Sequence, residues 1–296
     1  MSAPSMPARR FLGFPLPDVW FGQGCIGELT KVLARDEVSR VVVITGRSLA
    51  GNEDLMGRLR TALSGRHAGT FADTIPHVPR RTVLAAAEAC MAAGADAIVS
   101  FGGSTPNDTA KAAALALAED FRREEDFDRF AIRFRYPSTR IEVPISGRAL
   151  PIYAVPTTLS AGEFTAYAGV TDPAGRHKDL FRDPQLVARA VFLDPELTRA
   201  TPEQLWLSTG MKAVDHCVEA WLSTRAQPLT DAVASYAFAT LNRCLPVTRR
   251  DPADLAARLE CQIAAWMSVL GLSNVTLGLS HGLGHQLGGV AAPRTG

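Results

Sequence analysis

The stretch that decides the fold is AIVSFGGSTPNDTAKAAALALA, residues 97–118. Its short apolar run stops at Gly102 and Gly103, and an alanine-rich pattern with helical spacing follows. The stretch therefore predicts a strand, a tight turn and a helix. Glycine lets the backbone turn sharply and approach a ligand, while the free amides and positive dipole end of the new helix favour an anion such as phosphate. A turn required only for packing gives the same pattern, so both interpretations stay open until other motifs are considered.

Composition argues against several classes of function. At 296 residues and 47% hydrophobic, the chain can bury a large core. The net charge is +1 with acids and bases interspersed, so we expect a small-molecule substrate and no nucleic-acid partner. No run approaches the roughly 18 apolar residues of a membrane helix, and residues 1–10 lack the core of a signal peptide. We therefore expect no membrane partner and a cytoplasmic location. The five cysteines form no CxxC pair and are expected to be reduced core residues.

Strand and helix patterns alternate through the first half of the chain. Strands are predicted at residues 40–46, 69–74, 97–101 and 151–155, and helices at 27–35, 52–63 and 80–93. This alternation predicts a parallel sheet with helices on both faces, which binds dinucleotides at the carboxyl ends of its strands. One more strand is predicted at 190–193. Beyond it, with Thr201 as the first cap, helices are predicted at 201–223, 229–245, 252–270 and 275–289.

The composition changes near residues 158–162, which places the predicted domain boundary there. We predict an α/β dinucleotide-binding domain at residues 1–160 and a helical substrate domain at residues 161–296. The segment 119–148 is rich in charge clusters and aromatic residues and contains two prolines. It is expected to be a partly ordered excursion and not a separate domain.

Two further motifs support the phosphate loop. PTTLSAGE, residues 156–163, follows an apolar run, and SHGLGHQLG occupies residues 280–288. With the glycine turn, they resemble the iron-containing alcohol dehydrogenase family, whose members carry GGGS-x-x-D-x-x-K, a later PTT and a C-terminal HGxxH. The loop here reads GGSTPNDTAK over residues 102–111, with Asn107 or Asp108 expected to cap its helix and Lys111 one turn further in.

The resemblance spans nearly the whole chain and looks nearest to the maleylacetate reductase branch. It implies the dehydroquinate synthase-like architecture of group III alcohol dehydrogenases, a Rossmann-like parallel-sheet domain followed by an all-helical domain. The helical domain is expected to be incomplete at its C-terminus, because relatives continue with further helices. We also expect a homodimer.

The resemblance implies a nicotinamide cofactor, NAD or NADP, and the residues that hold it. Thr157 and Thr158 match the family's cofactor-contacting pair, and Lys178 matches a lysine near the nicotinamide ribose. Turn chemistry for the threonines and a surface charge for Lys178 are the alternatives. The phosphate-loop candidates are Gly102, Gly103, Ser104 and Asp108.

Cofactor choice is expected to depend on the end of the strand at 40–46. An acid there favours a free ribose 2′-hydroxyl, whereas Arg favours a 2′-phosphate. Where the family often has Asp, this sequence has Gly46, Arg47 and Ser48. We predict that NADPH is used at least as well as NADH. The alternative is that Arg47 faces solvent.

Three histidines match the family's metal and proton-transfer positions. His281 and His285 share one helical face, and His216 lies in GMKAVDHCVEA, residues 210–220. In metal-dependent relatives the ligands of the ion are an Asp four residues before this His, the His itself, the first His of HGxxH and a further downstream His. Here Lys212 stands at the Asp position, and the sequence ends at Gly296 before a downstream HG. His216 and His281 alone would bind iron or zinc weakly, so metal dependence is not expected.

These residues predict an NAD(P)-dependent oxidoreductase that transfers hydride to or from a small oxygenated substrate, either maleylacetate or an aldehyde/alcohol pair. His285 would relay the proton, and His281 with His216 would bind or polarise the substrate oxygen. Lys212 lies one helical turn from His216, so a buried ammonium there would take over part of the metal's electrostatic role. The alternatives are a remnant that binds dinucleotide or only dimerises, and a dehydroquinate synthase or glycerol-phosphate dehydrogenase on the same superfold.

Overall fold

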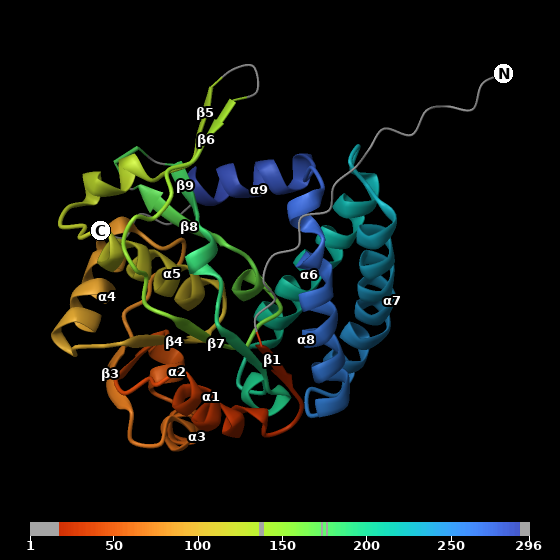
Figure 1. The fold of residues 1–296 in the computed structure, drawn as a ribbon. Coiled ribbons are helices and arrows are strands. Elements are labelled where there is room, and N and C mark those ends of the chain that lie inside the picture. The colour runs from red at the N-terminus through yellow and green to blue at the C-terminus, as the bar shows by residue number, and fades with distance from the viewer. Residues whose placement is uncertain (1–17, 136–138, 173, 176, 291–296) are drawn as a thin grey trace.

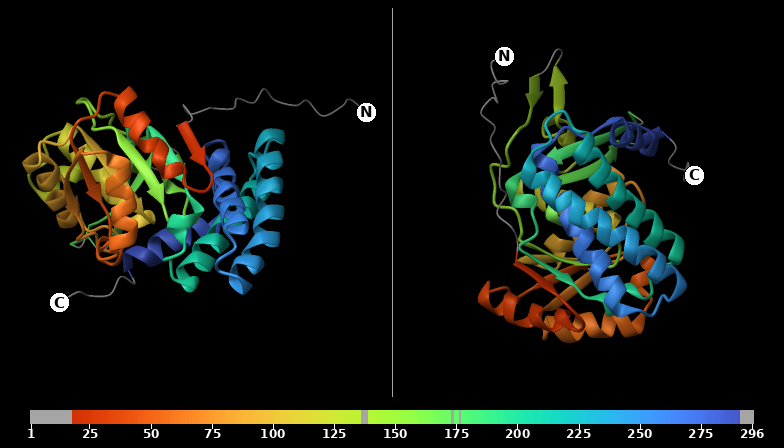
Figure 2. Two further views of the ribbon diagram at one scale, coloured as in Figure 1. Left: turned by 90° about the horizontal axis from the view of Figure 1, so that it is seen from below. Right: turned by 90° about the vertical axis from the view of Figure 1, so that its right-hand side faces the viewer.

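The computed structural model describes residues 18–135, 139–172, 174–175 and 177–290, apart from the side chains of 285–290. An α/β part and a group of long helices lie side by side (Figures 1 and 2). The predicted fold class, a parallel sheet followed by a helical part, is confirmed.

The sheet has six parallel strands. Their order is β1 (Asp18–Phe21), β10 (Ala190–Leu193), β7 (Ile152–Pro156), β4 (Ala97–Gly102), β2 (Val41–Ile44) and β3 (His67–Phe71). Every residue of β2, β4, β7 and β10 is buried, as expected for parallel strands covered on both faces. β1 is an edge strand that pairs with β10, with Asp18 opposite Ala190. β3 begins and ends earlier than the predicted 69–74.

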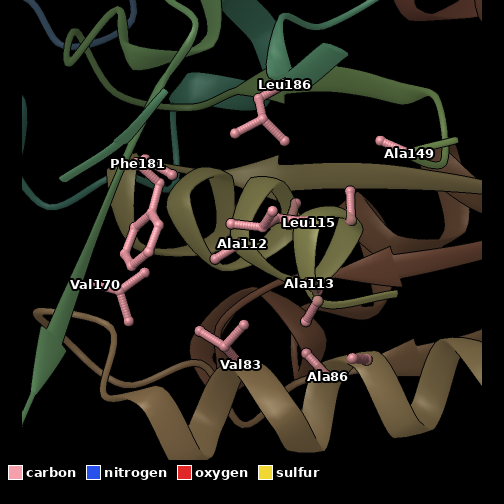
Figure 3. Close-up of a cluster of buried hydrophobic side chains, with 14 of the residues drawn as sticks. Val83, Ala86, Ala112, Ala113, Leu115, Ala149, Val170, Phe181 and Leu186 are labelled. Carbon is pink, nitrogen blue, oxygen red and sulfur yellow. The ribbon is translucent and has the colours of Figure 1, made fainter. Parts of the chain in front are cut away.

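Helices cover both faces of the sheet. On one face, α1 (Leu29–Arg35) and α3 (Glu53–Leu63) pack on the alternate residues Val41 and Val43. On the other, α4 (Arg80–Ala92) and α5 (Ser104–Ala118) pack on Val42 and Ile44. Figure 3 shows Val83 and Ala86 of α4 facing Ala113 and its neighbours on α5. The alanine-rich sequence of α5 lets this helix lie close to its neighbours, and ten of its residues are buried.

The excursion after α5 contains a short helical turn (Glu124–Arg129) and the hairpin β5 (Arg133–Arg135) and β6 (Thr139–Ile141). This hairpin projects from the body of the molecule (Figure 1). A second hairpin, β8 (Tyr167–Asp172) and β9 (His177–Arg182), packs against α5. Buried Arg80 ties the region together, with Nη2 2.6 Å from both Asp128 Oδ1 and Asp179 Oδ2.

The helical part comprises α6 (Glu203–Leu222), α7 (Pro228–Arg250), α8 (Leu255–Leu270) and α9 (Leu279–Val290). The first three pack on one another, whereas α9 reaches back to β9 (Figure 1). Thr201 does not cap α6, because the helix begins at Glu203 and the Thr201 hydroxyl donates to the Thr157 carbonyl at 2.7 Å.

The structure shows the state of the cysteines and how far one long apolar segment is buried. All five cysteines are free, as predicted; four of them are buried in the core, whereas Cys25 is only half-buried. Among the described residues, the segment Leu255–Asn274 is long and apolar enough to span a membrane by length and composition, but half of its most apolar part is buried inside the fold.

Candidate active site

Two cavities meet between the sheet and the long helices. The strand-end cavity, of about 670 Å³, lies at the carboxyl ends of β2, β4 and β7 and is lined by Gly46, Arg47, Gly102, Gly103, Thr157 and Thr158, among others. The helical-side cavity, of about 990 Å³, is lined by Asp108, Lys178, Lys212, His216 and His281 together with many apolar residues. Ser104 and Thr209 line both. The structure therefore brings the predicted residues other than His285, whose side chain lies outside the described residues, into two adjoining spaces.

The glycine turn positions the start of α5 at this junction. Gly102 has a φ of 138°, and a Cβ there would lie 2.9 Å from Pro106 Cγ. A Cβ on Gly103 would lie 3.0 Å from the Thr158 side chain. The helix begins directly afterwards, at Ser104, with no side chain capping it. A side chain at either position would thus crowd its neighbours, and the same turn leaves the helix N-terminus facing the strand-end cavity.

The predicted caps are wrong, because α5 begins at Ser104, so Asn107 and Asp108 already lie inside the helix. Asn107 is buried. The Asp108 carboxylate points to the helical-side cavity, where it accepts from the Gly169 amide at 3.3 Å and lies 3.9 Å from Lys178 Nζ. Burial raises the pKa of Asp108, and the charge of Lys178 opposes that rise.

Lys111 serves a different part of the structure. Its side chain is fully buried, and its ammonium donates to the carbonyls of Gly162, Thr165 and Tyr167 at 2.6, 2.5 and 3.1 Å. Burial lowers its pKa to about 8. It therefore fixes the segment after β7, which we call the dividing segment, residues 157–165. This segment lines both cavities.

Thr157 and Thr158, at the start of this segment, lie beside the glycine turn. Thr157 N donates to the Gly102 carbonyl at 2.9 Å, which continues the pairing of β7 with β4. The Thr158 hydroxyl is 3.4 Å from Ser160 Oγ. Both threonines are buried and line the strand-end cavity.

At the far end of the same cavity, Arg47 forms an ion pair that the sequence did not suggest. Arg47 Nε lies 2.7 Å from Asp73 Oδ1, and Asp73 itself bridges to Gly46. Asp73 follows β3, the neighbour of β2 in the sheet. The only sequence signal for it was that parallel strand ends meet at one edge of a sheet.

The helical-side cavity contains a histidine pair. The rings of His216 on α6 and His281 on α9 have centroids 5.7 Å apart. His216 Nδ1 is 3.5 Å from Ser268 Oγ. Burial lowers the pKa of His281 to about 4, and the positive charge of Lys212 acts in the same direction. His281 is therefore neutral at pH 7. His285 lies further along α9, and its side chain is outside the described residues.

Glu219 holds the start of α9 and was not predicted to have a role. Its carboxylate accepts from the His281 backbone amide at 3.0 Å, and Oε2 lies 3.6 Å from His281 Nδ1. Glu219 is buried on α6, three residues after His216. That helical spacing was the signal that it shares a face with His216.

Lys212 lines the same cavity as His216, as its spacing predicted. Its ammonium lies 2.6 Å from Asp215 Oδ2, and 40% of the side chain is exposed. The expectation of a buried lysine is therefore wrong, because the side chain reaches the cavity surface and pairs with an acid of its own helix.

The side chains that the structure describes do not fit an iron or zinc site. A metal ion needs three or four donors with suitable charge. Within the described parts of the chain, no group of three or more His, Cys, Asp or Glu side chains could hold one. An ammonium stands beside the two histidines, and the nearby Asp215 is paired with it.

The strand-end cavity does fit a dinucleotide. The start of the fifteen-residue helix α5 faces it, and helix N-termini bind phosphate through free amides and the helix dipole. The cavity lies where open parallel sheets bind dinucleotides. Fold and site together define a dinucleotide-binding protein of the two-part, sheet-and-helix type.

Comparisons with known proteins agree. The family profile "Iron-containing alcohol dehydrogenase" matches residues 17–195, and "Fe-containing alcohol dehydrogenase family, C-terminal" matches residues 206–292. The chain belongs to the iron-containing alcohol dehydrogenase family. It is accordingly an NAD(P)-dependent oxidoreductase, and nothing in the comparisons supports the alternative of an impaired remnant.

The individual relatives include maleylacetate reductases and alcohol dehydrogenases. The maleylacetate reductase of Pseudomonas sp. (strain P51) is 31% identical over 281 residues, 95% of this chain and 70% of that protein. The NAD-dependent methanol dehydrogenase of Bacillus methanolicus is 30% identical over 273 residues, 91% of this chain and 68% of that protein. The crystal structure of maleylacetate reductase from Agrobacterium tumefaciens matches with a TM-score of 0.77 and 26% identity, over 97% of this chain and 71% of that one.

Proposed function

We propose that this oxidoreductase reduces a small carbonyl compound bound in the helical-side cavity, with the cofactor in the strand-end cavity. The observation that carries the proposal is that Ser104 and Thr209 line both spaces. A dinucleotide whose pyrophosphate lies at the start of α5 can therefore extend toward the histidine pair.

The cofactor residues have separate tasks in this proposal. Backbone amides at Gly103 and Ser104 bind the pyrophosphate, and Thr157 and Thr158 form the adjoining wall. Lys178 holds the nicotinamide ribose, because it lines the helical-side cavity with its ammonium 3.9 Å from Asp108 Oδ2. Bound NAD(P)H supplies the hydride.

The substrate oxygen is bound by groups on α6 and α9. Neutral His281 can donate one hydrogen bond to a carbonyl, and the ammonium of Lys212 stabilises the negative charge that develops on the oxygen. His216 supports His281 from α6. His285 relays the proton to the product oxygen.

Maleylacetate is the substrate that we favour within this class. Besides Lys178, the cationic side chains of Arg140, Lys212 and Arg225 line the helical-side cavity and suit a substrate with carboxylates. The apolar residues around them, including Phe164 and Trp266, exclude water from the reacting carbonyl. An uncharged aldehyde is the second candidate, because the methanol dehydrogenase relative is named for a simple alcohol.

The test is a titration of the full chain with NADH and NADPH, followed by turnover with maleylacetate and with simple aldehydes. We expect saturable cofactor binding and oxidation of the cofactor that depends on maleylacetate, with slower turnover of aldehydes. Turnover of aldehydes alone would transfer the proposal to the second candidate. Binding without any turnover would contradict the proposed reaction.

The remaining proposals concern the context of the enzyme. We propose that it acts as a cytoplasmic homodimer, with a dinucleotide-binding domain at residues 1–160 and a substrate domain at residues 161–296. Light scattering of the purified chain tests the dimer. Expression of the two segments separately tests whether each folds without the other.

A further inference from the structure

The end of β2 lacks the acid that usually reads the adenosine ribose. Gly46 occupies this place, and a Cβ there would have Thr74 Oγ1 as its nearest neighbour, at 3.7 Å. The space in front of Gly46 is therefore open. The segment after β3 reaches the same place, because β2 and β3 are parallel neighbours, and Asp73 bridges to Gly46.

Asp73 lies close enough to Arg47 to compete with a ligand for its guanidinium group. Both residues line the strand-end cavity, and the Arg47–Asp73 pair is joined at 2.7 Å. The side chains are 83% and 62% exposed, so the pair adds little to stability and is free to rearrange around a ligand. In the absence of a ligand, the Arg47 guanidinium therefore pairs with the Asp73 carboxylate.

We propose that Asp73 is the residue that reads the adenosine ribose and that it makes this enzyme prefer NADH to NADPH. The inference rests on the proposed function. A ribose 2′-hydroxyl can donate to the Asp73 carboxylate, whereas a 2′-phosphate is repelled by it. Arg47 attracts a 2′-phosphate only by leaving Asp73, so its attraction and the repulsion by Asp73 offset each other. This choice is opposite to the one that Gly46 and Arg47 predicted from the sequence.

The experiment measures dissociation constants of NADH and NADPH for the full chain and for Asp73→Asn. In the wild type we expect NADH to bind more tightly by about tenfold. Asp73→Asn removes the repulsion and releases Arg47, so the ratio of the two constants should shift toward NADPH by at least about tenfold. Arg47→Met should leave NADH binding nearly unchanged and weaken NADPH binding.

Two further variants separate a reading role from a general effect of charge. Asp54→Asn removes an equally exposed aspartate that pairs with Arg58 on α3 and does not line the cavity, so the ratio should not move. Gly46→Asp combined with Asp73→Asn transfers the acid to the end of β2, where space exists, and should restore the preference for NADH.

The possible failures are distinguishable. If Asp73→Asn weakens both cofactors equally, or leaves their ratio unchanged, the inference is overturned while the proposed function stands. A wild-type preference for NADPH would also overturn it. If neither cofactor binds the wild type, the proposed function fails and this inference fails with it.

Discussion

The strand-end cavity and the helical-side cavity are built from different parts of the polypeptide. The first consists largely of backbone turns and small residues at the ends of buried strands, such as Gly102 and Thr157. The second depends on charged and aromatic side chains of α6, α8, α9 and the hairpin β8–β9. A site made by backbone is expected to keep its chemistry when a side chain changes, for example where Ser104 stands at the third glycine of the family's GGGS pattern. A site made by side chains changes with one residue, as Lys212 illustrates.

The largest expected effect is on the backbone-made cavity. In Gly103→Val, the new Cβ would lie 3.0 Å from the Thr158 side chain. The valine would also stand between the α5 amides and a phosphate. We expect cofactor affinity to fall by at least about 100-fold, with the fold largely retained. Titration with NADH and the melting temperature measure the two effects.

Gly57→Val is the matched control for this variant. Gly57 lies on α3, and a Cβ there has no neighbour within 4 Å, so binding should be unaffected. Cofactor affinity that is unchanged in Gly103→Val would show that the glycine turn serves packing alone.

A smaller effect is expected when the helical-side cavity loses the ammonium of Lys212. Lys212→Ala should lower kcat/KM by about 100-fold, because a fixed charge at the developing oxyanion is lost, and should leave the dissociation constant of NADH unchanged. Activity of the wild type should survive prolonged chelation. Steady-state kinetics and metal analysis of protein purified without added ions provide the measurements.

Lys31→Ala is the control here, because Lys31 is an exposed lysine outside both cavities. Stoichiometric bound metal in the wild type, or undiminished activity of Lys212→Ala, would be incompatible with a metal-free role for this lysine.

The smallest effect concerns the dividing segment between the cavities. Burial raises the pKa of Glu163 from 4.5 to about 7. The folded state therefore retains a proton that the unfolded state has lost, and the free energy of unfolding should fall as the pH rises from about 4.5 to about 7. Glu163→Gln should remove this contribution, which is on the order of 2 kcal/mol. Urea unfolding at pH 5 and pH 7.5 measures it.

Neighbouring charges do not obscure this test. Lys111 has a lowered pKa of about 8, so its own contribution acts above the window. Asp108, whose pKa is also raised, adds a slope of the same sign that remains in the variant. The exposed Glu88→Gln is the control, and equal pH slopes for all three proteins would refute the assignment to Glu163.

The sequence predicted the parts of the fold that depend on local pattern. Buried parallel strands such as Val41–Ile44 are continuous apolar runs, and the predicted run at 40–46 contains this strand. Helix caps were predicted less well, because Ser104 starts α5 before Asn107 and the Thr201 hydroxyl bonds to Thr157 instead. Local propensity cannot show which distant carbonyl will compete for a hydroxyl group.

The candidate site was predictable where residues that are close in the sequence are also close in the structure. Lys212 and His216 share a helical face by spacing alone. Asp73 and Glu219 were missed, because their roles come from the pairing of β2 with β3 and from the packing of α9 on α6. Lys111 was placed near the phosphate loop, although its ammonium is directed to the carbonyls of the dividing segment.

The pairing of β1 with β10 has a consequence for the synthesis of the chain on the ribosome. β1 emerges first, but its partner in the sheet, Ala190–Leu193, is translated only after every other strand of that sheet. The central strands can pair before β10 is made. β1 can join the edge of the sheet only after β10 has been translated, because β10 is its partner. Such distant contacts form slowly, because a long loop must be ordered before they form. Nascent chains that stall before Leu193 should therefore carry an unpaired first strand, which chaperones must shield.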